Sequence, residues 1–182
     1  ADLKTYTHEP ASGGVPKQLV ILLHGVGANG QDLIGLAPFF SQALPDAVFV
    51  SPDAPFPYDM APTGYQWFSL RDRSPDFIMQ GVQTAAPIVS SYIKAQMDQH
   101  GVEPDKTALV GFSQGTMMSL YVAPRYVHEL AGVLGYSGAL IDGAGLGGAE
   151  IQKFPVHLIH GEADEVVPVE QYYEAEKALK EA

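Results

Sequence analysis

The sequence predicts an α/β fold in which helices cover both faces of an open, mostly parallel sheet. Short apolar runs of strand length alternate along the 182 residues with longer segments that suit helices. The apolar runs show little polar alternation, which is typical of strands buried on both faces of a parallel sheet. The repeated order of strand, helix and strand favours helices on each side of one sheet. No repeat, charge block or low-complexity linker marks a second domain, so we expect residues 1–182 to form a single domain.

Five apolar runs are expected to form the strands of this sheet. They are residues 18–23, 47–50, 107–110, 131–136 and 154–159.

The clearest helix is expected at residues 75–99. Ser74 precedes it as a capping residue, Pro75 suits its first position and Gly101 suits its exit. Pro87 lies inside this segment and should kink or divide the helix. Further helices are expected at residues 30–43, 114–128 and 169–180.

The long connection at residues 51–74 is rich in proline and aromatic residues. It cannot form one regular element, yet it is too apolar for a plain solvated loop. Loops of this length in compact domains are usually functional or disordered. Two interpretations stay open, an aromatic-packed surface loop or one wall of a substrate pocket.

Composition excludes several function classes. The formal charge is −11, from 21 acidic against 10 basic residues, so nucleic acid and anionic membrane surfaces are poor partners. The absence of cysteine excludes disulfides, thiolate metal sites and a cysteine nucleophile. No apolar run is long enough for a transmembrane helix, and the first residues show no signal-peptide pattern. We expect a cytoplasmic protein, and the sequence leaves a homodimer open.

The stretch GFSQG places Ser113 between two glycines, directly after the expected strand at residues 107–110 and before the helix at 114–128. This context is the one that a nucleophile elbow requires, because a tight strand-to-helix turn lifts the serine hydroxyl clear of the sheet. The alternative is a glycine-rich connection that happens to contain a serine. A serine alone is a poor nucleophile, so catalysis also needs a base and an oxyanion-stabilising site.

The turn HGVGANG, after the strand at residues 18–23, can supply that oxyanion site. The backbone N–H of Val26 is expected to point to the same spot as the N–H of Gln114. We expect His24, which precedes this turn, to be structural.

The turn HGEADEVVP offers an acid. Asp164 is the candidate, because it follows the last expected strand and precedes the segment that starts the next helix. A solvated acidic turn is the alternative, and it fits Glu162 and Glu165 well.

In this order and spacing, LHGVG, GFSQG and HGEADEVVP resemble motifs of the phospholipase/carboxylesterase family of α/β hydrolases, the group that includes acyl-protein thioesterases. The resemblance implies hydrolysis of esters or thioesters by a Ser-His-Asp triad, with Ser113 as nucleophile and Asp164 as acid. It implies an oxyanion hole formed by Val26 and Gln114. It also implies that the segment with Trp67 and Phe68 lies near the acyl pocket. Many members read GFSQGG, whereas Thr116 follows here, and this change should leave the elbow intact.

Met117 and Met118 begin the helix after the nucleophile. Met117, like Trp67 and Phe68, is a candidate substrate contact, and we expect at least one of the two methionines to pack in the core.

The base is the missing part of this triad. In this fold the order is Ser, Asp, His, so the histidine should lie C-terminal to Asp164, and none does. We expect the histidines of this sequence to be structural and the base to lie beyond Ala182. The chain would then be shortened by a strand, a turn and a helix, which is about 25 residues at ordinary element lengths. The histidines present are His8, His24, His100, His128, His157 and His160.

Neither a cofactor nor a metal is expected. GAGLGG at residues 143–148 matches a dinucleotide-binding pattern, but it leads into a strand rather than a helix, so we interpret it as a loop. No histidine and carboxylate pair shows a recognised ligand motif.

Two function classes therefore remain. The first is a serine carboxylesterase acting on small-molecule esters with short or medium acyl chains, with lysophospholipase or acyl-protein thioesterase activity as variants. The second is a non-catalytic binding protein with an α/β-hydrolase fold, favoured only by the absent histidine.

Overall fold

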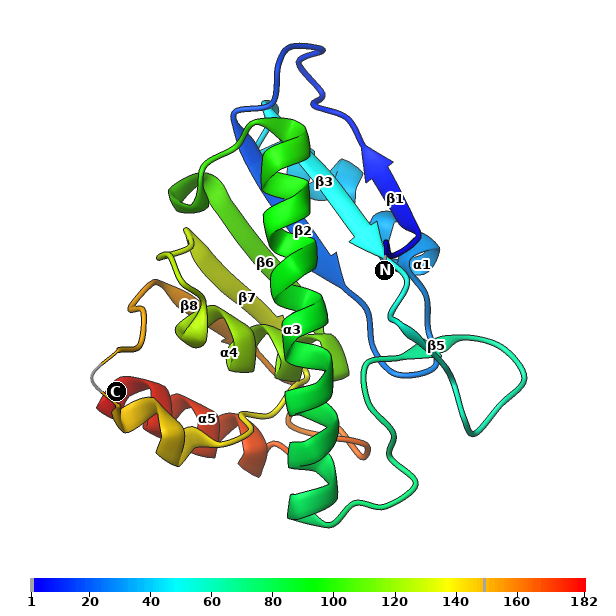
Figure 1. Cartoon of the computed structure of the whole chain (residues 1–182), viewed down its shortest axis with the longest axis vertical. Helices are drawn as coiled ribbons and strands as arrows, with labels where there is room; N and C mark the ends of the chain where they lie inside the picture. The colour runs from blue at the N-terminus through cyan, green and yellow to red at the C-terminus, as the bar shows by residue number, and fades with distance from the viewer. Residues whose placement is uncertain (1, 149) are drawn as a thin grey trace.

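A mostly parallel sheet forms the centre of the protein, as the computed structural model of residues 2–148 and 150–182 shows (Figure 1). Its strand order is β1-β3-β2-β6-β7-β8. Only β1 runs antiparallel to its neighbour, and the other pairs are parallel. The α/β fold predicted from the sequence is confirmed. The strands are β1 (Thr5–His8), β2 (Gln18–Leu23), β3 (Ala47–Pro52), β6 (Thr107–Phe112), β7 (Gly132–Tyr136) and β8 (Val156–Ile159).

Helices cover both faces of the sheet because its central strand is apolar on both faces. In β2, Leu19 and Ile21 join the core cluster under α3 (Pro75–His100) and α4 (Gln114–Arg125). The alternate residues, Val20 and Leu22, join a second cluster under α1 (Gly30–Ile34) and α2 (Ala37–Ser41). In Figure 1, α3 crosses in front of the sheet and α1 lies behind it. The last helix, α5 (Glu170–Glu181), packs on the β8 side.

The single helix expected at residues 30–43 is wrong. The structure has α1 and α2 instead, separated by Gly35 and Leu36. Pro38 explains the break, because its ring would clash with the carbonyl of Ile34 if α1 continued.

The helix at Pro75–His100 is one unbroken element, so Pro87 does not divide it. Its buried face, which includes Val82, Val89 and Ile93, packs into the core on both sides of the proline and outweighs the lost backbone bond. Ser74 occupies the N-cap position without a side-chain capping bond. Gly101 ends the helix in the left-handed conformation, with φ 65°, as expected.

Several elements were not foreseen. Strand β1 carries no apolar run, and the long connection contains a small hairpin of β4 (Phe56–Pro57) and β5 (Tyr65–Gln66). The segment expected as a loop at residues 143–148 contains a 3-10 helix, η2 (Gly143–Gly147), that begins where the Asp142 side chain accepts the Gly145 N–H. Helix α4 ends at Arg125, three residues before the expected boundary. No helix in the described ranges is long and apolar enough to cross a bilayer.

Candidate active site

The strand order reverses at β2, and this reversal brings two of the predicted turns together. From β2 the chain continues to β3 on one side, and it then crosses to β6, β7 and β8 on the other side. Ligands of open α/β sheets bind at such a switch point, outside the carboxyl ends of the strands. A Cβ added at Gly25, in the turn after β2, would lie 3.4 Å from the Cβ of Ser113, which follows β6. The two turns are therefore in contact.

Ser113 has the strained backbone of a nucleophile elbow. Its φ is 53° and its ψ is −111°, and it stands between the last residue of β6 and the first of α4. Non-glycine residues rarely adopt positive φ, and such strain persists only where the surroundings hold it. The Ser113 N–H donates to the Tyr136 carbonyl at 2.8 Å, across the end of β7. Next along the sheet, Ser137 also has positive φ, 51°, and its N–H donates to the Ile159 carbonyl at 2.9 Å.

The two glycines of GFSQG allow this turn. A Cβ at Gly111 would lie 2.5 Å from the backbone N of Thr116, and one at Gly115 would collide with the Leu23 carbonyl of β2. Helix α4 therefore packs closely against both β6 and β2.

The Ser113 Oγ makes no hydrogen bond to the part of the chain that the structure describes, and the residue is half-buried. Gln114 is the first residue of α4, so its backbone N–H has no acceptor within the helix. Both groups are therefore available to a substrate.

The turn after β2 is held by its own backbone and by the long connection. Gly27 N–H donates to the Tyr65 carbonyl at 2.8 Å, and Tyr65 N–H donates to the Ala28 carbonyl at 2.9 Å. The N–H of Val26, the residue before Gly27, finds no acceptor among residues 2–148 and 150–182. It is therefore available, like the N–H of Gln114.

His24 is a structural residue in this turn. Its Nδ1 lies 2.6 Å from the Gly25 carbonyl and its Nε2 accepts the Ala54 N–H at 2.9 Å, so both ring nitrogens are occupied. Burial lowers the pKa of His24 below 6.5. The ring is therefore neutral, with the proton on Nδ1, and cannot serve as a base.

Asp164 is anchored by the backbone of its own turn. Its Oδ1 accepts the N–H groups of Val166 and Val167, each at 2.9 Å. These two bonds, aided by His160 and Ser137, hold the pKa of the Asp164 carboxyl below its usual range. Its Oδ2 lies 3.6 Å from His160 Nε2. The carboxylate is thus ionised and oriented, in a turn that follows β8.

His160 does not complete a triad despite this proximity. Its side chain is only 2% exposed, and its Nε2 lies 2.7 Å from the Val167 carbonyl, to which it must donate. Among the other histidines, His8 lies in β1, His100 ends α3 and His157 is exposed on β8. None of them is hydrogen-bonded to Ser113 or Asp164 within the described ranges. The histidine base stays a prediction.

The three expected substrate contacts differ in exposure. Trp67 is 0% exposed and Phe68 is 2% exposed, so neither offers surface to an acyl chain in this structure. The Trp67 indole Nε1 donates to the His24 carbonyl at 2.9 Å, which ties it to the turn after β2. Met117 is half-buried, while Met118 is fully buried in the core, as expected for one of the pair.

Sequence reasoning missed the side chain of Gln114. Its amide binds the backbone of Trp67 and Phe68 in the long connection, with Oε1 accepting the Trp67 N–H and Nε2 donating to the Phe68 carbonyl. No local signal could have revealed this, because the partners lie more than forty residues away in the sequence. The position of Gln114 next to Ser113, the candidate nucleophile, was the only available hint.

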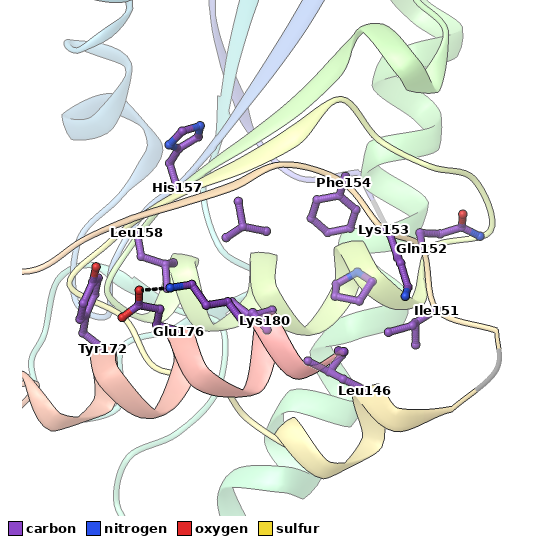
Figure 2. Close-up of a pocket in the computed structure, with 14 residues that line it drawn as sticks. Leu146, Ile151, Gln152, Lys153, Phe154, His157, Leu158, Tyr172, Glu176 and Lys180 are labelled. Carbon is purple, nitrogen blue, oxygen red and sulfur yellow. Dashed lines mark hydrogen bonds and ion pairs between the residues drawn. The ribbon is translucent and has the colours of Figure 1, made fainter.

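A cavity of about 600 Å³ lies between β8, α5 and the segment before β8 (Figure 2). Leu158 points into it from β8, whereas His157 points to the opposite face of the sheet, and Lys180 pairs with Glu176 at 2.6 Å. Ser113 and Asp164 are not among the residues that line it. This cavity is therefore separate from the candidate active site.

Within the described residues, no group of three or more His, Asp or Glu side chains is placed to hold a metal ion.

Known proteins match both the sequence and the fold. The sequence model of the phospholipase/carboxylesterase family matches residues 10–182. Esterase YpfH of Escherichia coli (strain K12) is 31% identical over 163 residues, covering 90% of this chain and 68% of that protein. Acyl-protein thioesterase 1 of Saccharomyces cerevisiae is 29% identical over 167 residues, covering 84% of this chain and 73% of that protein. The crystal structure of esterase PE8 has a TM-score of 0.93 and 38% identity, covering 100% of this chain and 85% of that one. The chain belongs to the phospholipase/carboxylesterase family of α/β hydrolases.

Proposed function

We propose that the protein is a serine carboxylesterase that hydrolyses short- to medium-chain carboxylic esters through an acyl-enzyme on Ser113. The observation that carries the proposal is the elbow, where Ser113 has φ 53° at the start of α4 and touches the turn after β2. Membership of a family of ester hydrolases supports the reaction class.

In the first half of the proposed reaction, the Ser113 Oγ attacks the ester carbonyl carbon while its proton passes to a histidine base. The electron pair of the carbonyl moves to its oxygen, and this oxyanion accepts hydrogen bonds from the backbone N–H groups of Val26 and Gln114. Each donor of this kind contributes about 3 kcal/mol to stabilising the transition state. The intermediate then collapses, the bond to the alcohol oxygen breaks, and the alcohol leaves with the proton from the base.

In the second half, water attacks the acyl-enzyme with the same base and the same donors, which releases the acid and restores Ser113. Asp164 orients the base and stabilises its charged form. The lowered pKa of Asp164 supports this role, because the carboxylate keeps its charge at neutral pH. The base itself is proposed to be a histidine C-terminal to Asp164 in the order of the fold.

The preference for shorter acyl chains rests on the long connection. Trp67 and Phe68 fill the space beside the elbow instead of leaving it open. Of the expected contacts, only half-buried Met117 keeps surface for an acyl chain. Thioester hydrolysis is the second candidate, since relatives at 28% and 29% identity are named acyl-protein thioesterase 1.

Labelling with a fluorophosphonate and hydrolysis of p-nitrophenyl butyrate test the proposal together, with a form of the protein that contains the proposed C-terminal histidine as the parent in these and all later assays. Ser113→Ala should abolish labelling and reduce hydrolysis to no more than a few per cent, because triad members act as a unit. Ser91→Ala, an exposed serine on α3, is the matched control and should label at the parent rate. Labelling that survives in Ser113→Ala would rule out Ser113 as the nucleophile. A parent that contains this histidine and still never labels would favour the non-catalytic binding class.

We further propose that residues 1–182 all belong to one catalytic domain. One sheet and its two flanking clusters account for the core from Leu3 to Leu179, with no second core in the described ranges.

A further inference from the structure

We infer that the side chain of Gln114 is a positioning residue, which sets the distance between the two oxyanion donors by holding residues 65–68 to the elbow. The inference rests on the proposed function and assigns Gln114 a second role beside that of its backbone N–H.

Both polar atoms of the Gln114 side-chain amide bind the long connection. Its Oε1 accepts the Trp67 N–H and its Nε2 donates to the Phe68 carbonyl, both at 2.7 Å. The residue is 1% exposed, so water does not compete for these bonds. A backbone N–H beside a backbone carbonyl also fixes which way the amide is oriented, since only one orientation satisfies both.

The segment that Gln114 holds is bound on its other side to the turn after β2. The Trp67 indole donates to the His24 carbonyl, and the two rings pack with centroids 5.7 Å apart. Tyr65 exchanges two backbone bonds with Gly27 and Ala28. Residues 65–68 therefore bridge the turn that carries Val26 and the residue that carries the second donor.

This bridge matters because the donors stand on different chain segments. An oxyanion hole works only when both donors lie about 2.7–3.1 Å from one oxygen, and a displacement of about 1 Å can cost a hundredfold in rate. The second donor, the backbone N–H, belongs to the same residue as the amide that binds residues 65–68. If the amide bonds are lost, residues 65–68 and the Val26 turn bound to them can move relative to this N–H. Because the bridge is fixed, the two donors do not need to move during the reaction.

Gln114→Met tests the inference, because it keeps the length and apolar volume of the side chain and removes both bonds. We expect kcat on p-nitrophenyl butyrate to fall about a hundredfold, by the cost of a displaced donor, with KM changed much less. The affinity for an alkylboronic acid, which forms a tetrahedral adduct on the serine, should fall in parallel. Gln96→Met on α3 is the matched control, since Gln96 is 8% exposed and lies outside the site, and it should keep the parent kcat.

Gln114→Glu adds a second measurement, the pH dependence of kcat, which would not change if Gln114 only stabilised the fold. The carboxylate can accept the Trp67 N–H, but only its protonated form can donate to the Phe68 carbonyl. Burial raises the pKa of a carboxyl group, so the ratio of the variant's kcat to that of the parent should rise as the pH is lowered. If Gln114→Met does not fold, two measurements still test the inference. One is this ratio, and the other is kcat of Trp67→Phe, which lacks the indole N–H and should show a smaller loss.

Parent-like kcat and boronate affinity in Gln114→Met, or a Gln114→Glu ratio that does not change with pH, would overturn the inference. These outcomes leave the proposed function standing as long as Ser113→Ala is inactive. Activity in Ser113→Ala would instead overturn the proposed function itself.

Discussion

The carboxylate of Asp164 makes its shortest contacts with backbone N–H groups of its own turn, at Val166 and Val167. The same two bonds hold its pKa below the usual range, so the turn supplies both the orientation and the charge of the proposed acid. These functions can be separated, because an asparagine retains an oxygen acceptor but has no charge.

At this scale, Asp164→Asn is expected to retain the fold and lose activity. The asparagine oxygen can still accept the two backbone N–H groups, whereas the neutral amide cannot stabilise a charged histidine. We expect kcat on p-nitrophenyl butyrate to fall about a thousandfold or more, as for other triads of this type. Glu165→Gln, which changes the exposed neighbour, should keep the parent rate. A parent-like rate in Asp164→Asn would show that another group is the acid.

At the scale of elements, α4 and β7 approach closely because two glycines make room for Thr116. A Cβ at Gly135 would lie 2.6 Å from Thr116 Cγ2, and a Cβ at Gly138 would also collide with this side chain. The Thr116 hydroxyl donates to the Tyr136 carbonyl at 2.8 Å, the same oxygen that accepts the Ser113 N–H. Thr116, which stands where many family members have glycine, therefore fits beside the elbow without disturbing the Ser113 N–H bond.

Gly135→Ala should destabilise the protein through overpacking, by about 1–3 kcal/mol in the free energy of unfolding. Thr116→Ser removes the methyl group that the new Cβ would meet and keeps the hydroxyl. The double variant should therefore recover much of the loss, which urea unfolding of the parent, the single variants and the double variant can measure. Additive losses would mean that Thr116 is not the neighbour that limits position 135.

At the scale of the whole molecule, the candidate site draws on four separate stretches of chain, at residues 24–28, 65–68, 113–114 and 164. His24 belongs to the first, and it is buried and neutral within the core of the site. Its titration is therefore linked to the stability of the fold as a whole.

The free energy of unfolding should fall as the pH is lowered below about 6.5, in part because of His24. Its folded pKa is lowered by burial, so in this window the unfolded chain binds a proton that the folded one does not. The stabilising contribution of neutral His24 is complete at pH values above the pKa of His24 in the unfolded state. It is lost as the pH falls toward the pKa of His24 in the folded state. Urea unfolding at several pH values should give a shallower slope for His24→Gln than for the parent. Equal slopes would show that His24 titrates alike in both states.

Features that depend on neighbouring residues could be predicted from the sequence. The elbow is one, because Gly111 and Gly115 flank the serine directly, and the both-face burial of β2 is another. Features that depend on distant partners could not. The sequence of a long loop does not indicate whether an aromatic residue in it is exposed or buried, so only the structure shows that Trp67 is buried. The polar strand β1 has its place through pairing with β3, which no local pattern reveals.

The bonds from Ser113 to Tyr136 and from Ser137 to Ile159 have a consequence for how slowly the site opens. Both N–H groups belong to turns, yet each continues the ladder between adjacent parallel strands past the strand ends. Hydrogen exchange at an amide requires its bond to open, and bonds of a central sheet open only with the most stable unit of the fold. The amide of Ser113 should therefore exchange with deuterium as slowly as those of β6, and far more slowly than loop amides such as Ser74. The proposed nucleophile would then lose its geometry only when the sheet itself comes apart.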